Sequence, residues 1–299
     1  MDQFHLMSVF IAVAEEQGFA AASRKLNISP PAVTRAISAL EDKLGVKLLN
    51  RTTRHVRTTD AGQRYLEDAR RILQQVEIAN EAALGINSEP KGHLSVTAPV
   101  LFGQKYIVPC IAEYLDTYPE TEIDAVFLDR VVNLMEEGLD LGIRIGHLPD
   151  SSMRAKRVGS VRLLCLASSN YLKTHGIPQS PKDLEQHSII LSKTGSLLQG
   201  WQFNLAGKTQ NINFKPRLTV STNQGAINAS KEHLGIIRTL SYQVEDELNS
   251  GKLKTILENY EPEPMPVHII HREGRYASSK VRCFIDLLAK NLADNKILN

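Results

Sequence analysis

The sequence predicts an α/β protein in which a small helical module and one long helix precede a larger domain of strands and helices. Residues 1–58 carry short amphipathic helical patterns, and residues 60–86 carry a single long one. After residue 92, short apolar strand patterns, the first of them His93–Ala98, alternate with helical patterns, which include a short helix at Val131–Glu137. That alternation is typical of βαβ units and predicts a mostly parallel sheet. The segment 86–92, which contains Ser, Pro and Gly, is expected to be a linker.

The length and composition fit a soluble globular protein of about two domains. The chain has 299 residues, 42% of them hydrophobic and 23% charged, and a net charge of +2. No stretch approaches ~18 uninterrupted apolar residues, and the first ten residues lack the basic segment of a secretory signal. Cys110, Cys165 and Cys283 have no metal-like spacing. We therefore expect reduced thiols, a cytoplasmic location, and neither a metal nor a cofactor.

The early helical patterns predict two helices joined by a tight turn. Residues 19–26 place apolar side chains on one face. Residues 27–28 leave room only for a tight turn. Ser29 followed by Pro30 then indicates a second helix start, with a hydroxyl cap and proline in the first helical position. This second helix is expected to run to about Leu44, which completes a helix-turn-helix.

The second helix of this pair has two different faces. Its predicted buried stripe repeats at helical spacing and consists of Val33, Ile37, Leu40 and Leu44. The opposite face is short, polar and basic, and consists of Pro31, Thr34, Arg35 and Ser38. Such a face suits a helix that enters the major groove of DNA.

A basic segment follows the helix pair. Residues 43–64 carry six Lys or Arg residues against one acid, a local charge of +5. Residues 51–59 are rich in β-branched types and predict a two-stranded wing, which would bring Arg51 or Arg54 to the phosphates or the minor groove. A charge run alone is more often a solvated face. The coincidence of tight turn, polar face and basic wing nevertheless indicates binding to double-stranded DNA.

The long helical pattern over residues 60–86 contains a heptad-like apolar stripe. Its positions alternate in steps of four and three: Tyr65, Ala69, Ile72, Val76, Ala79, Ala83 and Ile86. One interpretation is a helix that packs on its own domain. The charged opposite face favours dimerisation instead, which would hold two recognition helices over the two halves of a dyad.

Four segments of the chain resemble one known family. The run from Ala12 to Gly62 resembles the DNA-binding module of LysR-type transcriptional regulators. Segments 98–103, 139–152 and 233–253 resemble the effector domain of the same family, so the resemblance extends over nearly the whole chain. Such regulators are usually tetramers that bind interrupted dyads near promoters, and their effectors are small molecules.

The resemblance also implies a domain organisation. Residues 1–59 would form a winged helix-turn-helix DNA-binding domain, and residues 60–91 a dimerisation helix and hinge. Residues 92–299 would form a two-lobed effector-binding domain that resembles periplasmic binding proteins. Lobe I would comprise residues 92–162 and 266–299, and lobe II residues 163–265.

The family's DNA contacts can be carried over one residue at a time. Pro30 and Pro31 stand where the family contacts thymine methyls, although many members have Gln at the position of Pro30, and proline cannot make that side-chain hydrogen bond. Thr34 matches a phosphate contact, Arg35 the base reader, and Arg54 the minor-groove arginine. The complete candidate set is Ser29, Pro30, Pro31, Thr34, Arg35, Ser38, Arg51 and Arg54.

An effector site is expected beyond the carboxyl ends of the strands, where helix N-termini point into a crevice. The candidate residues at these strand ends are Pro99, Val100, Leu101, Phe102, Ile145, Gly146, His147, Cys165, Leu166, Thr222 and Asn223. Two helix N-termini, after Ala98 and after Ser221, suit a small anion. Many relatives have Ser or Thr where Leu101 stands, so a polar anchor would depend on Thr222, Asn223 and backbone N–H groups.

The sequence therefore predicts a sequence-specific DNA-binding transcriptional regulator that responds to a small-molecule effector. A DNA-binding protein that regulates without a small ligand, for example by thiol oxidation, is the alternative. An enzyme is not expected, because the chain has no GxSxG, HExxH, GxGxxG or P-loop motif.

Overall fold

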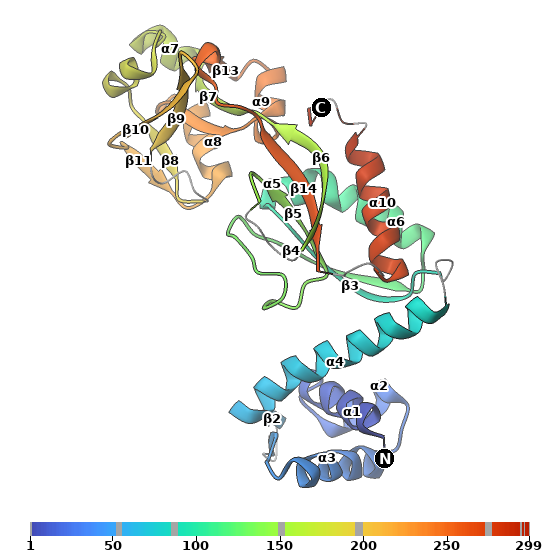
Figure 1. Cartoon of the computed structure of the whole chain (residues 1–299). Helices are drawn as coiled ribbons and strands as arrows, with labels where there is room; N and C mark the ends of the chain where they lie inside the picture. The colour runs from blue at the N-terminus through green and yellow to red at the C-terminus, as the bar shows by residue number, and fades with distance from the viewer. Residues whose placement is uncertain are drawn as a thin grey trace. The chain divides into compact units, whose positions relative to one another are not determined.

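The computed structural model describes residues 2–51, 56–84, 89–148, 153–194, 200–272, 277–293, 295 and 297–298. It divides the chain into two compact units, Met1–Ser88 and Glu89–Asn299. Figure 1 shows both units, and each is described by itself below. The boundary lies three residues before the predicted start of the effector domain at residue 92. In the described part of the chain, no helix is long and apolar enough to cross a membrane.

The N-terminal unit contains a helix-turn-helix, a wing and a long helix. Its elements in chain order are α1 (Gln3–Glu15), α2 (Phe19–Leu26), α3 (Pro30–Leu44), β1 (Leu49–Arg51), β2 (Val56–Thr58) and α4 (Asp60–Leu84). The two short strands pair antiparallel, as expected for a wing. A shared apolar core joins α1, α2 and α3 through side chains such as Phe10, Ala22, Val33 and Ile37.

Helix α3 begins and ends where the sequence predicts. Ser29 is extended and Pro30 is the first helical residue. Gly45 ends the helix with φ of 68°, in the left-handed region that favours glycine. Two predictions for this helix are wrong. The Ser29 side chain makes no cap hydrogen bond. Leu44 is 40% exposed, whereas Leu40 is fully buried. The core of the unit ends at Leu40, and the last helical turn extends past it.

The apolar stripe of α4 has two parts with different surroundings. Leu66 and Ala69 are buried, and the Tyr65 ring packs edge-on against Phe10 at 5.5 Å between ring centroids. This first part packs on its own unit. Farther along, Ile72 is 39% exposed, Val76 is half-buried and Ala79 is exposed. The predicted stripe positions Ala83 and Ile86 lie outside the described side chains.

The first lobe of the C-terminal unit is built on a five-stranded sheet. The strand order is β4-β3-β5-β14-β6, formed by β3 (Gly92–Ala98), β4 (Thr121–Phe127), β5 (Leu141–Ile145), β6 (Arg154–Val161) and β14 (Met265–His271). A short helix α5 (Val100–Phe102), a π-helical turn (Gly103–Ile107) and α6 (Val108–Thr117) follow β3. Helix α10 (Ser279–Ala293) packs beside α6, where Phe284 meets Tyr114 edge-on at 5.0 Å between ring centroids.

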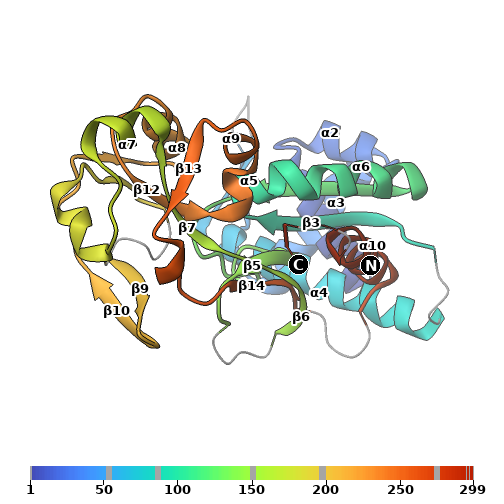
Figure 2. The same cartoon turned by 90° about the horizontal axis from the view of Figure 1, so that it is seen from above.

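The second lobe has a central three-stranded antiparallel sheet of order β12-β7-β13. Figure 2 shows β7 in this lobe beside β12 and β13. The strands are β7 (Leu163–Ser168), β8 (Ile190–Ser192), β9 (Trp201–Leu205), β10 (Lys208–Ile212), β11 (Leu218–Val220), β12 (Ile237–Leu240) and β13 (Leu253–Ile256). The helices are α7 (Ser169–His175), α8 (Asn223–Lys231) and α9 (Glu245–Asn249). The predicted lobe boundary at residues 162–163 falls between β6 and β7.

Two local predictions for the C-terminal unit are wrong. The sheet is mixed rather than mostly parallel, because β14 runs antiparallel to both β5 and β6. The segment Val131–Glu137, predicted as a short helix, forms turns. In it, Asn133 Oδ1 accepts a hydrogen bond from the backbone N–H of Met135 at 3.1 Å. Such local side-chain bonds compete with helix formation.

Candidate DNA-contact surface and interlobe cavity

The outward face of α3 carries the predicted DNA contacts. Ser29, Pro30, Pro31, Thr34 and Arg35 are exposed, and Ser38 is half-buried. The Thr34 hydroxyl donates to the carbonyl of Pro30 at 3.2 Å. Arg35 forms no ion pair with any residue in the described ranges, so its guanidinium is available to an external partner.

The start of α3 leaves the Ser29 hydroxyl unused. The Ser29 side chain makes no cap hydrogen bond. Proline at the second helical position, Pro31, has no N–H to donate, and the N–H of Ala32 is bonded to the Ser29 carbonyl at 2.9 Å. Within the described part of the chain, the hydroxyl therefore stays available to contact a phosphate or a base edge.

Glu41 connects α3 to the wing and was not predicted as a functional residue. Its carboxylate, 3% exposed, accepts hydrogen bonds from the backbone N–H groups of Leu48 at 2.9 Å and Leu49 at 3.2 Å. The Lys47 ammonium lies 2.7 Å from its second oxygen. Burial alone would raise the pKa of Glu41, but these hydrogen bonds outweigh it and lower the pKa. An acid inside an otherwise apolar helical stripe was the sequence signal.

The wing residues stay predictions. Arg51 lies in β1, where it pairs with Val56 of β2. The side chain of Arg51, and Arg54 altogether, lie outside the described residues.

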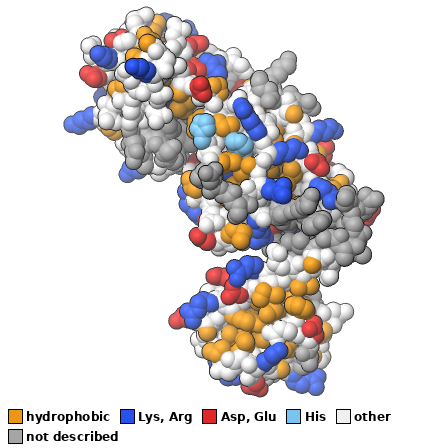
Figure 3. Space-filling view, viewed as in Figure 1, with side chains coloured by type: hydrophobic (Ala, Val, Ile, Leu, Met, Phe, Trp, Pro, Cys, Tyr) orange, Lys and Arg blue, Asp and Glu red, His pale blue; other side chains and the backbone are white. Residues whose placement is uncertain are grey.

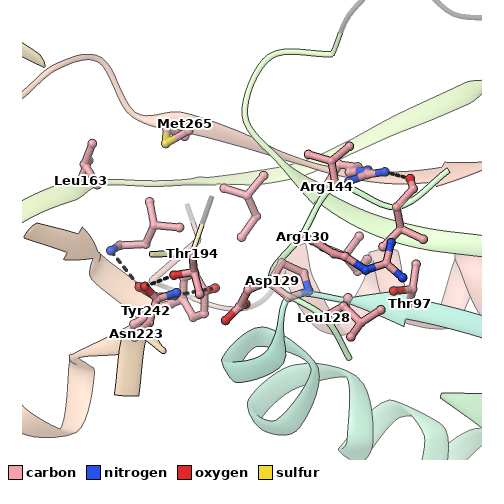
Figure 4. A pocket seen from close by; sticks show the side chains of 18 residues that line it. Thr97, Leu128, Asp129, Arg130, Arg144, Leu163, Thr194, Asn223, Tyr242 and Met265 are labelled. Carbon is pink, nitrogen blue, oxygen red and sulfur yellow. Dashed lines mark hydrogen bonds between the residues drawn. The ribbon is translucent and has the colours of Figure 1, made fainter. Parts of the chain in front are cut away.

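A cavity of about 220 Å³ lies between the two lobes of the C-terminal unit (Figure 4). The first lobe contributes its strand ends and the segment after β4, and the second contributes β7, β12 and the start of α8. The lining residues include Thr97, Ala98, Pro99, Leu128, Asp129, Arg130, Val131, Val132, Ile143, Arg144, Ile145, Leu163, Thr194, Asn223, Leu240, Tyr242, Gln243 and Met265. Its volume is below the ~300–1,000 Å³ of pockets for drug-sized ligands, so it suits a small molecule.

The cavity brings together only some of the strand-end residues that the sequence singled out. Pro99, Ile145 and Asn223 line it. Those outside the lining are Val100, Leu101, Phe102, Gly146, His147, Cys165, Leu166 and Thr222. Of these, Phe102, Cys165 and Leu166 are buried in apolar cores, Leu101 packs between two cores, and His147 is exposed. Thr222 caps α8 by accepting from the N–H of Gly225 at 3.1 Å.

Three charged residues of the cavity were missed by the sequence reasoning. Asp129 and Arg130 lie two and three residues after the end of β4, and Arg144 lies in β5. Asp129 Oδ1 accepts a hydrogen bond from the backbone N–H of Val100 at 3.0 Å. The chain's own carboxylate therefore occupies one of the helix-end N–H groups at which a ligand anion was expected. A charged pair shortly after a strand was the available signal.

The cavity wall from the second lobe combines a buried tyrosine with a polar pair. Tyr242 packs edge-on against Phe102 at 5.2 Å between ring centroids, and Gln243 Nε2 donates to its hydroxyl at 3.2 Å. Burial raises the pKa of Tyr242, and the nearby charge of Asp129 adds to the effect. Thr194 Oγ1 donates to Asn223 Oδ1 at 2.7 Å.

Two protein-family models match the chain, one over the helix-turn-helix and one over the domain that contains the cavity. Residues 4–63 match the model described as "Bacterial regulatory helix-turn-helix protein, lysR family", and residues 87–293 match "LysR substrate binding domain". The chain belongs to the LysR family of bacterial transcriptional regulators. As a LysR-type regulator, it binds DNA through the N-terminal unit and a small-molecule effector through the C-terminal unit.

Individual relatives cover this LysR-type regulator almost completely. A sequence from Haemophilus influenzae named "Uncharacterized HTH-type transcriptional regulator" is 31% identical over 281 residues, covering 94% of this chain and 98% of the relative. "HTH-type transcriptional regulator CrgA" of Neisseria meningitidis serogroup B is 31% identical over 291 residues and 97% of each chain. The solved structure of CrgA superposes with a TM-score of 0.63 at 29% identity, covering 97% of this chain and 99% of that one.

The two buried thiols of this LysR-type regulator, Cys110 and Cys165, do not favour control by oxidation. Cys165 is buried, and burial raises its pKa to about 12. Burial also raises the pKa of Cys110. Oxidation proceeds through the thiolate, which a buried, high-pKa thiol rarely populates at neutral pH.

Proposed function

We propose that this regulator reads an interrupted dyad in double-stranded DNA, with Arg35 of α3 as the base-reading residue. The observation that carries this proposal is the exposed face of α3, on which Arg35 has no ion-pair partner in the described part of the chain. An arginine on a helix in the major groove pairs bidentately with guanine. Ser29 and Thr34, exposed at the start of the same helix, are suited to phosphate contacts.

The second half of α4 supports assembly into a dimer that presents two recognition helices. Ile72 is 39% exposed and lies on the same helical stripe as Val76 and Ala79. Figure 3 shows hydrophobic side chains gathered on one face of the N-terminal unit, whose exposed apolar side chains include Phe4 and Ile72. The same stripe on a second copy of the chain would cover these residues. A homotetramer built from two such dimers, acting in the cytoplasm, is the complete assembly that we propose.

The interlobe cavity supports effector binding between the lobes. It combines an apolar lining with a few polar groups, which is the usual make-up of a small-molecule site. A ligand that contacts Asp129 from one lobe and Asn223 from the other would bias the angle between the lobes, and so couple binding to DNA affinity.

The proposal is tested by operator selection followed by titration. Genomic fragments that the full-length chain retains are sequenced, and fluorescence anisotropy then measures affinity for the recovered site. We expect a dyad-symmetric consensus that Arg35→Ala no longer distinguishes from a mutated half-site. Recovery of fragments without a shared sequence would contradict the proposal.

A further inference from the structure

The interlobe cavity is lined by three charged side chains, only one of which is ion-paired within the described part of the chain. Asp129 and Arg144 both line the cavity, and neither forms an ion pair with a residue in the described ranges. Arg130, the third charged residue of the lining, is paired: its two terminal nitrogens reach the Glu137 carboxylate at 2.6 and 2.7 Å. In the view of Figure 4, Asp129 lies between Arg144 on one side and Thr194 and Asn223 on the other.

Asp129 retains capacity for a further hydrogen-bond donor. One carboxylate oxygen accepts from the backbone N–H of Val100 at 3.0 Å, which fixes the orientation of the side chain. A carboxylate has about four acceptor positions, so this single bond leaves most of them open. The groups that suit these positions are N–H and O–H donors, and an ammonium suits them best because it also supplies the opposite charge.

Arg144 has spare donors on the same lining. Its guanidinium makes one hydrogen bond among the described residues, from Nη2 to the carbonyl oxygen of Val132. A guanidinium carries five N–H donors, so most of them remain for a ligand. Burial lowers the pKa of Arg144, and the charge of Glu137 compensates only in part. A carboxylate ligand would satisfy both the donors and the charge.

The remainder of the lining is largely apolar. Leu128, Leu163, Leu240 and Met265 contribute hydrocarbon or thioether surface, and Val131 is 83% exposed. An apolar side chain with this much exposed surface beside a cavity would be stabilised by contact with an apolar part of a ligand. The lining therefore suits a small molecule that combines an apolar group with two opposite charges.

We propose that the effector is a small zwitterion with an apolar side group, namely a free amino acid. Its ammonium binds Asp129 and its carboxylate binds Arg144. This inference rests on the proposed effector function of the cavity. Ligand binding removes water from both protein charges, and an unpaired charge is costly to bury. A simple anion would leave Asp129 unpaired and repelled, and a simple amine would do the same to Arg144.

The test compares ligands that differ by one charged group. The twenty common amino acids are each placed beside the matching amine-free acid and the matching carboxyl-free amine, as in leucine, 4-methylpentanoate and 3-methylbutylamine. Thermal shift of the full-length chain finds the binders, and calorimetry gives their affinities. At least one amino acid should bind more tightly than both of its counterparts by roughly tenfold or more.

Two substitutions assign the charges to their residues. Asp129→Asn keeps an oxygen for the Val100 N–H and should reduce the affinity for the amino acid to that of its amine-free acid. Arg144→Gln should reduce the affinity for the amino acid to that of its carboxyl-free amine. Asp124→Asn on β4 and Arg154→Gln on β6, both exposed and outside the cavity lining, are the matched controls and should bind as the wild type does.

The inference is overturned if no amino acid shifts the melting temperature, if an amine-free acid binds as tightly as its amino acid, or if Asp129→Asn leaves the affinity unchanged. Operator binding is measured in the same samples, against a broad metabolite library. A purely anionic or neutral compound that alters operator binding would contradict the proposal of a zwitterionic effector, but it would support the effector function of the domain. Operator binding that no compound changes would contradict the effector function itself.

Discussion

The carboxylate of Glu41, near the end of α3, accepts a hydrogen bond from the backbone N–H of Leu48, 2.9 Å away, just before the wing begins. A second bond from Leu49 and the Lys47 ammonium complete the contact. Helix α3, which we propose reads the major groove, is thereby joined to the wing, which we propose follows the DNA backbone. Glu41 is thus a positioning residue, with no direct contact to DNA required.

Glu41→Gln should destabilise the N-terminal unit by about 2 kcal/mol, because the charge-assisted hydrogen bonds become neutral ones. The pKa of Glu41 is lowered from 4.5 in the folded chain, so its contribution is fully present above that value and is lost as the pH falls through the folded-state pKa. Denaturant unfolding at several pH values measures this. The gap between wild type and variant should be largest near neutrality and should close in acid. Asp42→Asn, at an exposed neighbour, is the control.

Arg35→Ala should cost about 1–3 kcal/mol of affinity for the selected operator, because a bidentate pair with a guanine edge is lost. Anisotropy at fixed salt on matched and mismatched operators tests it, and discrimination should relax at one position in each half-site. Arg24→Ala, at an exposed arginine of α2, separates this effect from a general loss of positive charge. If Arg35→Ala still distinguished matched from mismatched operators as the wild type does, Arg35 of α3 would not be the residue that reads the groove.

Ile72→Asp combined with Val76→Asp should dissociate the dimer that we propose for α4, because two buried carboxylates would face their copies without partners. Sedimentation velocity reports the assembly state, and operator affinity should fall with it. Gln75→Asp adds a charge at an exposed position of the same helix and should leave the assembly intact. An unchanged assembly in the double variant would show that dimers form through another surface.

Thr222→Val should destabilise the second lobe by about 1 kcal/mol, because the hydroxyl caps α8 by accepting from the N–H of Gly225. Thermal unfolding measures the loss. Effector affinity should change little, since Thr222 lies outside the cavity lining and Asn223 lies within it. Thr222→Ser keeps the cap and should restore stability. A strong loss of effector affinity in the folded valine variant would place the hydroxyl at the ligand after all.

Elements with local signals could be predicted from the sequence. Pro30 and Gly45 fix the ends of α3 through backbone preferences that act within a few residues. The strand β3 was predicted within one residue of its observed start at Gly92. The helix predicted at Val131–Glu137 is wrong although the spacing of its apolar residues fits a helix. The side chain of Asn133 bonds locally to the backbone instead.

The cavity could be predicted only in outline, because it depends on how two lobes pack. Asp129 and Asn223 lie 94 residues apart in the sequence numbering and line one cavity. Leu101 stands at a strand end, as expected of a cavity residue, yet its side chain packs between two apolar cores. Side-chain direction at a strand end is decided by the neighbouring elements, which no local pattern shows.

Footprinting of the full-length chain on its selected genomic fragments tests the central claim most directly. Two recognition helices held by one dimer should protect two inverted half-sites whose centres are separated by a whole number of helical turns, each about 10–10.5 base pairs. Arg35→Ala should abolish that protection at the same protein concentration. Protection that is continuous and independent of sequence, or that survives Arg35→Ala unchanged, would contradict the account.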